Sequence, residues 1–331
     1  MKKMILAAGA VTVGLLVAGA GTAATAAVAG GAPPLCQTNC VTVFVPPGAG
    51  PHGPFGIARG PLGSEWFADG PADTIDRISQ QGTITASPVP TPGANPGWVT
   101  VDDSGNVWFA ERFAGKIGEI TPDGTITEFP LPSPSALPQG IVAAPDGNLY
   151  ITEQGTNAIA RLDPATGQVT QFPVPTPAAT PLGLALGPDG ALWFVERSAS
   201  KVGRMTLGGA FTEYSLAPGA SPNRIVAGPD GALWFTELFG NKIGRITTDG
   251  DLTEYPLPGG PVGITVGKDG HLYVALFSAH ALDQVSLSGQ ITGHWDLPGA
   301  LQVATGTGLT IWVADNFGGT VSRVTPYTTS R

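Results

Sequence analysis

Acidic side chains recur at one fixed place in this sequence, three residues after a repeated aromatic residue. The seven positions hold Asp69, Glu111, Glu153, Glu196, Glu237, Leu276 and Asp315. A ring of carboxylates could hold a divalent cation, because Mg²⁺ and Ca²⁺ prefer oxygen ligands. Eight positions further on, however, five units carry an arginine, and the unit that has Leu276 in place of the acid has Gln284 in place of the arginine. We therefore favour a carboxylate–guanidinium pair within each unit, and keep Glu237 and Asp315 as candidate metal ligands.

Histidine and cysteine offer the other candidates for chemistry. His52 and His280 are the weak candidates for a catalytic base, since both fall in loops at the end of the molecule where a ligand would enter; the alternative for each is a solvated loop histidine. Cys36 and Cys40 are the only cysteines, and an even pair in an exported chain predicts a disulfide, with a metal or redox role as the alternative. No serine, cysteine or lysine nucleophile stands beside a base.

These residues are positioned by a sequence repeat. The aromatic anchor occurs at Trp66, Trp108, Tyr150, Trp193, Trp234, Tyr273 and Trp312, with spacings of 42, 42, 43, 41, 39 and 39 residues. Within each unit, short β-branched and aromatic runs alternate with Asp-Gly turns, a pattern that predicts four antiparallel strands. Seven such units predict an all-β, seven-bladed propeller over residues 41–326. The last unit lacks a fourth strand, so we expect residues 41–46 to pair with the strand around Val321–Val324 and close the ring.

The two ends of the chain lie outside the repeats. Lys2 and Lys3, an apolar run and a small-residue cleavage site predict a secretory signal peptide over residues 1–27, hence a secreted protein; an uncleaved membrane anchor is the alternative. Residues 28–40 form an N-terminal segment with the two cysteines, and residues 327–331 form a C-terminal tail. The formal charge of −9 excludes nucleic acid and anionic membrane surfaces as partners. We expect one domain, a monomer and no membrane contact after signal cleavage.

Recurring phrases within the repeat resemble a known family. Trp234-Phe235-Thr236-Glu237 and Lys242–Thr247 (KIGRIT) are typical of the virginiamycin B lyase (streptogramin B lyase) family, and the resemblance covers the mature chain. It implies seven blades and a magnesium-dependent elimination that opens the lactone of a cyclic depsipeptide. It also implies histidines at the entrance of the innermost strand in blades six and seven. This sequence has Val262 and Leu301 there, and neither can move a proton or bind a metal.

Departures from the repeat at the axial mouth predict a mixed aromatic and polar ligand pocket. Its candidate residues are Phe55, Trp98, Gln139, Asn223, Arg224, Gln302 and Asn316; the alternative is that they only fill the central channel. We expect a binding propeller for a small-molecule or peptide-like ligand. One alternative is a lyase or hydrolase of cyclic depsipeptides or lactones such as streptogramin B antibiotics, with Mg²⁺ as the cofactor if it acts as a lyase. The other is a structural module with a cell-wall or protein partner. No cofactor is otherwise indicated.

Overall fold

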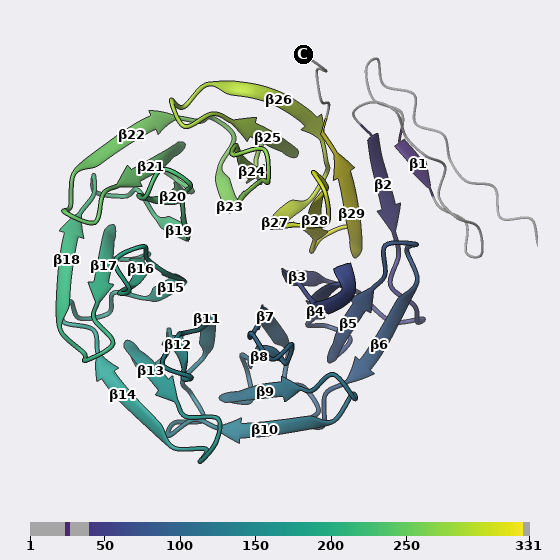
Figure 1. Cartoon of the computed structure of the whole chain (residues 1–331), viewed down its shortest axis with the longest axis horizontal. Coiled ribbons are helices and arrows are strands. Elements are labelled where there is room, and N and C mark those ends of the chain that lie inside the picture. The colour runs from purple at the N-terminus through teal and green to yellow at the C-terminus, as the bar shows by residue number, and fades with distance from the viewer. Residues whose placement is uncertain (1–23, 27–39, 327–331) are drawn as a thin grey trace, which may run out of the picture.

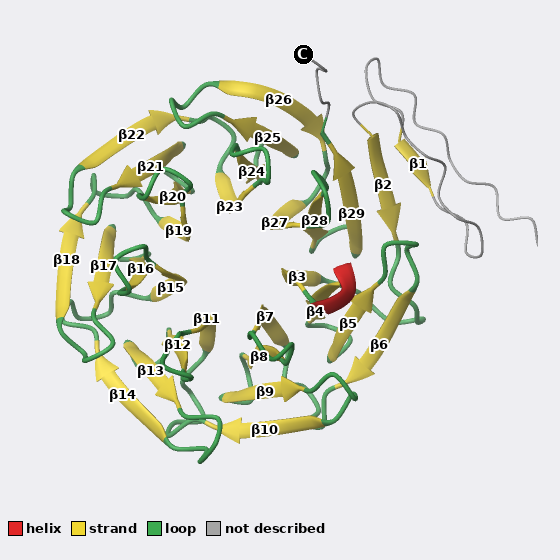
Figure 2. Cartoon of the chain, viewed as in Figure 1, coloured by secondary structure: helices red, strands yellow, loops and turns green. Residues whose placement is uncertain are grey.

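The computed structural model describes residues 24–26 and 40–326, and this part of the chain is almost entirely β-structure. Seven four-stranded antiparallel sheets stand around a central axis, and a short strand, β1 (Ala24–Ala26), is added to the edge of one of them (Figure 1). The helical element of the described residues is a 3₁₀ turn at Pro61–Gly63 (Figure 2). The predicted seven-bladed, all-β propeller is therefore confirmed. Within the described ranges, no helix is long and apolar enough to cross a membrane.

Each blade runs outward from the axis in chain order. The first three blades are β3 (Pro54–Arg59), β4 (Glu65–Asp69), β5 (Thr74–Ile78), β6 (Ile84–Pro88); β7 (Pro96–Val101), β8 (Val107–Glu111), β9 (Lys116–Ile120), β10 (Ile126–Pro130); and β11 (Pro138–Ala143), β12 (Leu149–Glu153), β13 (Ala158–Leu162), β14 (Val169–Pro173). The next three are β15 (Pro181–Leu186), β16 (Leu192–Glu196), β17 (Lys201–Met205), β18 (Phe211–Ser215); β19 (Pro222–Ala227), β20 (Leu233–Glu237), β21 (Lys242–Ile246), β22 (Leu252–Pro256); and β23 (Pro261–Val266), β24 (Leu272–Leu276), β25 (Ala281–Val285), β26 (Ile291–Asp296).

The seventh blade combines both ends of the propeller. It consists of β27 (Ala300–Thr305), β28 (Ile311–Asp315), β29 (Thr320–Thr325) and β2 (Cys40–Phe44). β2 lies antiparallel to β29, with Cys40 opposite Thr325 and Phe44 opposite Val321, which is the pairing expected from the sequence (Figure 1). Cys36 and residues 1–23 of the predicted signal peptide lie outside the described residues.

The turns use glycine where the backbone must enter the left-handed region. Gly231 and Gly250, in the Asp-Gly turns of blade five, have φ of 75° and 98°, and such angles cost a residue with a Cβ atom steric strain. The next strands, β20 and β22, begin two residues after these glycines, so each hairpin reverses within a few residues. The Asp-Gly pairs in the sequence therefore set the spacing of the strands.

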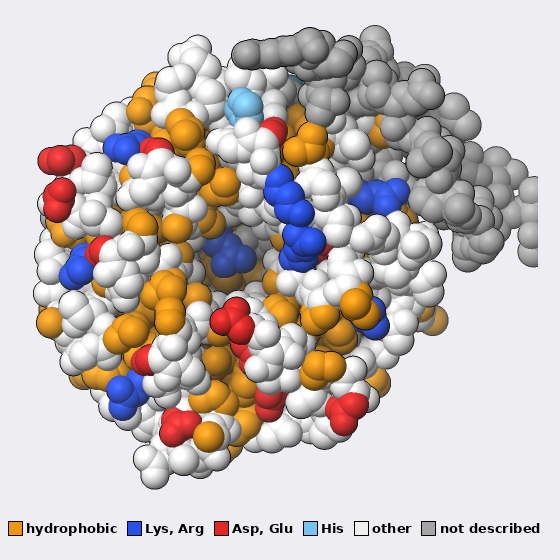
Figure 3. Space-filling model, in the orientation of Figure 1, with side chains coloured by type: hydrophobic (Ala, Val, Ile, Leu, Met, Phe, Trp, Pro, Cys, Tyr) orange, Lys and Arg blue, Asp and Glu red, His pale blue; other side chains and the backbone are white. Residues whose placement is uncertain are grey.

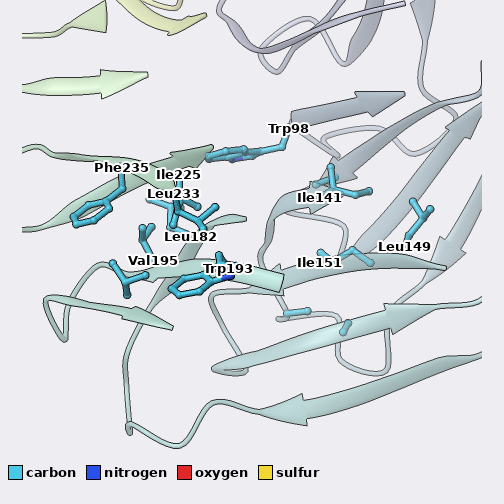
Figure 4. Close-up of a cluster of buried hydrophobic side chains, with 14 of the residues drawn as sticks. Trp98, Ile141, Leu149, Ile151, Leu182, Trp193, Val195, Ile225, Leu233 and Phe235 are labelled. Atoms are coloured by element: carbon cyan, nitrogen blue, oxygen red, sulfur yellow. The ribbon is translucent and has the colours of Figure 1, made fainter. Parts of the chain in front are cut away.

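Stacking of neighbouring blades forms the core. The aromatic anchors of blades two to seven are at most 2% exposed, and one buried cluster extends across blades two to five (Figure 4). Gly203 in β17 lies opposite Phe194 in β16, and a Cβ atom at Gly203 would overlap the Phe194 ring. The glycine in this third strand of the blade is thus required by the phenylalanine that packs over it.

Candidate functional site

An axial pocket of about 620 Å³ lies at the end of the ring where the innermost strands begin. We use this name for the cavity lined by the residues Phe55, Trp98, Arg112, Gln139, Gln154, Leu182, Arg197, Asn223, Leu238, Phe239, Asn241, Val262, Phe277, Ser278, Leu301 and Gln302. The lining combines apolar rings, amides and two arginines. Figure 3 shows the hollow at the centre of the ring, with basic side-chain atoms inside it.

Irregular pairing at the start of each innermost strand places these side chains. In β15 the register shifts between Pro181 and Leu184, and an equivalent shift occurs in each of the other innermost strands. A bulge re-aims side chains and is common beside binding sites. Leu182 lies within this irregularity and lines the pocket. The bulge therefore converts the beginning of each strand into pocket wall.

Three large side chains occupy a position where four blades have glycine. A Cβ atom at Gly183 would lie 2.6 Å from the carbonyl oxygen of Asn223 in the next blade, so neighbouring innermost strands approach closely there. Blades two, five and seven instead have Trp98, Arg224 and Gln302. The glycines of the other blades leave room near the axis, and these three side chains fill it.

A polar network connects these side chains across the channel. The guanidinium carbon of Arg224 lies 3.3 Å from the centroid of the Trp98 ring, and its Nε donates to Gln302 Oε1 at 2.6 Å. Trp98 Nε1 donates to Gln139 Oε1 at 3.0 Å, and Gln139 Nε2 donates to Gln154 Oε1 at 3.0 Å. Blades two, three, five and seven are thereby linked through side chains, which fixes the positions of the groups that face the ligand space.

Arginine side chains give the site its charge. Arg112 lies over the rings of Phe55 and Phe113, with its guanidinium carbon 5.7 and 5.6 Å from their centroids. Burial lowers the pKa of Arg112, and burial lowers the pKa of Arg224 to about 9. The lining contains no acidic side chain. The site is therefore a cationic region within an acidic protein.

Exposed phenylalanines surround the mouth. Phe113, Phe239 and Phe317 are 63%, 70% and 69% exposed, and all three stand five residues after an aromatic anchor. Phe277, in the corresponding loop of blade six, lies with its ring centroid 5.5 Å from that of Phe317. Large apolar side chains gathered on a surface mark a binding site more often than scattered ones do. This aromatic rim favours a ligand with apolar groups.

The structure brings together most of the residues singled out in the sequence. Phe55, Trp98, Gln139, Asn223 and Gln302 line the axial pocket. Arg224 adjoins it through Trp98 and Gln302. Asn316 is elsewhere: its Nδ2 donates to the carbonyl oxygen of Gly53 at 2.9 Å, so it holds a loop and is not part of the lining.

The two catalytic candidates are outside the lining. His52 Nδ1 is hydrogen-bonded to Asp69 Oδ2 at 2.6 Å, and its Nε2 is buried without a partner among the described residues. His280 is exposed and has a φ of 54°, the conformation that Asn241 has in blade five. His280 therefore occupies a turn, and His52 braces the loop that precedes β3.

The carboxylates of the predicted ring are not arranged as a metal site. Within the described ranges, no group of three or more His, Cys, Asp or Glu side chains could hold a metal ion. Asp315 Oδ1 accepts a hydrogen bond from the Gly318 amide at 2.6 Å, and Glu237 is fully buried. Neither side chain lines the axial pocket.

The predicted pairing of these acids with arginines is wrong. Arg204 binds Asp189 at 2.7 Å and Arg245 binds Asp230 at 2.6 Å. In the sheet, Arg204 is opposite Trp193, whereas Glu196 is opposite Lys201. Residues 193 and 196 are an odd number of positions apart, so their side chains point to opposite faces. A constant offset along the chain therefore does not bring the arginine to the glutamate.

The buried glutamates instead contact a second glutamate on the outermost strand. Burial raises the pKa of Glu196 to about 8, and the negative charge of Glu213 adds to the effect. Glu213 in turn accepts a hydrogen bond from Lys201 Nζ at 2.8 Å. Glu111 with Glu128 and Glu237 with Glu254 repeat this arrangement. Protonation of the buried carboxyl in each pair avoids both the cost of burying a charge and the repulsion from the outer carboxylate.

Sequence reasoning missed about half of the lining. Arg112, Gln154, Arg197, Leu238 and Phe277 all stand four residues after the aromatic anchor, next to the buried acidic position. The internal alignment that yielded the entrance residues contains this signal as well. The side chains at this position differ in type from blade to blade. The preceding position was noticed because it repeats an acid, whereas this position repeats no residue type.

Comparisons of sequence and of structure both relate this chain to the virginiamycin B lyase family. The model of the virginiamycin B lyase family matches residues 35–166 and 145–330. A solved streptogramin B lyase structure is 32% identical with a TM-score of 0.82, covering 86% of this chain and 97% of that chain. Virginiamycin B lyase from Staphylococcus aureus is 35% identical with a TM-score of 0.79, covering 83% and 95%.

A third solved structure contains a ligand. It is a catalytically inactive variant of the Staphylococcus aureus virginiamycin B lyase with quinupristin, which is 32% identical with a TM-score of 0.82 and covers 87% of this chain and 99% of that chain. The search of curated proteins found no match.

Proposed function

Since the chain belongs to the virginiamycin B lyase family, we propose that it is a secreted propeller that binds an amphipathic, peptide-like molecule in its axial pocket without opening a lactone ring. The observation that carries the proposal is the chemistry of the lining. It contains no histidine, aspartate, glutamate, lysine, cysteine or tyrosine. A molecule held there meets rings, amides and guanidinium groups, which bind a ligand but do not accept a proton from it.

Elimination from a lactone makes two demands on a site. A base must reach a proton on carbon, and an electrophile must stabilise the charge that develops. A positioned base typically contributes about 10²- to 10⁴-fold to the rate. Val262 and Leu301, at the two entrances where the family resemblance implies histidines, offer neither group. Mg²⁺, which the family implies, is bound through one or two carboxylates in most proteins, and the lining does not fit it.

The lining does fit an amphipathic ligand. The exposed rings of Phe239 and Phe277 offer stacking surfaces at the rim, and the amides of Gln139 and Asn223 offer donors and acceptors below them. A cavity of about 620 Å³ is within the range typical of small-molecule sites. Binding of quinupristin by a relative of similar fold supports a cyclic peptide as the first ligand to test.

The experiment measures binding and ring opening together. The purified mature protein is titrated with virginiamycin B by calorimetry, and the mixture is then incubated with Mg²⁺ and separated by chromatography. Elimination leaves the mass unchanged whereas hydrolysis adds one water, so fragmentation spectra are needed to identify the linear products. We expect saturable binding and intact ligand. Turnover would contradict the proposal, and absence of binding would refute it.

Matched variants test whether the axial pocket is the site. Phe239→Ser removes an exposed ring of the lining and should weaken binding about 3- to 20-fold, equivalent to one lost aromatic contact. Leu62→Ser removes an even more exposed apolar side chain, 92% against 70%, from the turn between β3 and β4. It should leave the affinity unchanged.

A second candidate function is lactone elimination. Identities of 32–35% to solved lyases over most of their length favour it. In this case His280, which is exposed in the loop after β24, or His52, in the loop before β3, would have to act on the substrate. Magnesium-dependent ring opening that is abolished by His280→Ala but retained in His294→Ala, a histidine on the outer strand, would establish this alternative.

A further inference from the structure

Three arginines at the axial pocket have no acidic partner. Arg112 and Arg197 line the pocket, and Arg224 contacts two lining residues, Trp98 and Gln302. Across residues 40–326, none of the three forms an ion pair with an aspartate or glutamate. Arg204 and Arg245, on the outside of the blades, each have an aspartate. Arginines without an ion pair also occur elsewhere in the described chain, but Arg112 and Arg197 both face one cavity whose lining contains no acidic side chain.

The unsatisfied hydrogen-bonding groups of the lining are donors. Arg112 Nε and Gln302 Nε2 are buried and have no hydrogen-bond partner among the described residues. Arg197 Nε has one weak partner, Ser221 Oγ at 3.3 Å. Leaving a buried donor unpaired costs free energy, and the cost is greater for a charged group. A ligand that supplies acceptor atoms and negative charge would remove both costs.

We propose that the axial pocket anchors the carboxylate of its ligand, and that the protein therefore binds linear, amphipathic peptide-like acids in preference to the neutral cyclic form. Planar guanidinium groups match a carboxylate through paired hydrogen bonds. The aromatic rim then receives the apolar part of the same molecule. This inference rests on the proposed function, because it concerns what the ligand of that pocket must carry.

A carboxylate is favoured over an inorganic anion by the surroundings of the arginines. Phe55 and Phe113 cover the Arg112 guanidinium, and Leu182 and Leu301 belong to the same lining. Apolar walls of this kind contribute little to a fully hydrated phosphate or sulfate, whereas they gain from an acid that has an aromatic or aliphatic body. The charge and the apolar surface are thus parts of one recognition site.

The first experiment compares two forms of one molecule. Virginiamycin B is titrated into the protein as the intact lactone and after its lactone has been hydrolysed by mild alkali, which yields a free carboxylate. We expect the opened acid to bind about 10- to 100-fold more tightly than the intact lactone. This is the gain in affinity that one charge-assisted hydrogen-bonded pair provides. N-acetyl-phenylalanine and its methyl ester form a second pair, in which only the charge differs. Equal affinities within both pairs would overturn the inference.

Arginine variants identify the anchor. Arg112→Gln and Arg197→Gln should each reduce the preference for the acid over the neutral form, because the affinity for the acid falls more than the affinity for the neutral form. Arg204→Gln removes the same charge from a site that is not in the lining and should leave the preference unchanged. Thermal unfolding of each variant confirms that it is folded. A preference that survives both pocket variants would refute the assignment.

Other outcomes separate this inference from the function it rests on. Inorganic phosphate and sulfate are titrated alone; affinity equal to that of the organic acids would refute selection of a carboxylate. If both forms of virginiamycin B bind equally and Phe239→Ser weakens both, the pocket binds a ligand but not through charge. If neither form of virginiamycin B binds, and neither N-acetyl-phenylalanine nor its methyl ester binds, the proposed function fails as well.

Discussion

The buried glutamate of blade four gives a sharp test of the electrostatics of the fold. Glu196 is fully buried at the end of β16, and its pKa lies at about 8, mainly because burial disfavours the charged form. At neutral pH the side chain is therefore mostly protonated, which avoids repulsion from the charge of Glu213. Glu196→Gln introduces a side chain of nearly the same shape that is neutral at every pH tested, because the amide does not titrate in this range.

The sign of the pH dependence follows from this raised pKa. Between pH 4.5 and about 8, the folded state holds a proton that the unfolded state releases, so stability is fully present below pH 4.5 and is lost as the pH rises. A pKa of about 8 against 4.5 corresponds to a loss of about 3 kcal/mol at pH 7. Glu196→Gln should therefore gain about 1 to 3 kcal/mol at pH 7 and almost nothing at pH 4.5.

Chemical unfolding followed by tryptophan fluorescence at pH 4.5, 6, 7 and 8 measures the effect. Glu153→Gln is the matched control, because in blade three Gln171 Nε2 already donates to Glu153 Oε2 at 2.5 Å. The gain there should be smaller, since an amide stands where blade four has a second carboxylate. A Glu196→Gln variant that gains equally at all four pH values, or loses stability at pH 8, would refute a protonated Glu196.

Further predictions concern the fold. Removing residues 28–47, which include β2, should lower the melting temperature by about 5 °C or more. Removing residues 327–331 should change the melting temperature by less than about 1 °C. Equal effects of the two deletions would argue against a structural role for β2. Trp98→Ala should cost about 3–5 kcal/mol in chemical unfolding, because Trp98 is 2% exposed and packs on Arg224; a cost below about 1 kcal/mol would show that the channel network is dispensable. Gly203→Ala should cost about 1–3 kcal/mol through overlap with Phe194, while Gly208→Ala, whose nearest atom would be 3.8 Å away, should be neutral; similar costs at both sites would contradict the packing argument.

The fold could be predicted in detail because its signals are local and repeated. Anchors such as Trp193 and Trp234 stand at the same place in successive units, and Asp-Gly turns mark the strand ends. A single short strand is difficult to recognise in a sequence, but the same pattern in seven units identifies it. The pairing of β2 with β29 followed from the same alignment, since the last unit lacked one strand and the N-terminus carried a matching one.

The candidate site was predicted in part. Phe55, Gln139 and Asn223 were found because they begin innermost strands, and those ends converge on the axis. Asn316, which directly follows β28, was also placed in the pocket, yet it bonds to Gly53. Arg112 and Arg197 were missed, although the repeat places them in equivalent loops. Position in the repeat identifies the end of the ring that a residue occupies, but the direction of its side chain depends on the neighbouring loop.

The sequence by itself determined the number of blades, the order of the strands and the absence of histidine at the entrances occupied by Val262 and Leu301. These properties depend on residue type and spacing, which are fixed along the chain. Only the tertiary structure decided the partners of the charged groups. Arg204 reaches Asp189 and not Glu196 because the pleat of the strand separates the two faces. Arg112 forms no ion pair because the pocket lining around it contains no acidic side chain. Charge pairing depends on direction and distance in space, and a linear repeat does not contain either.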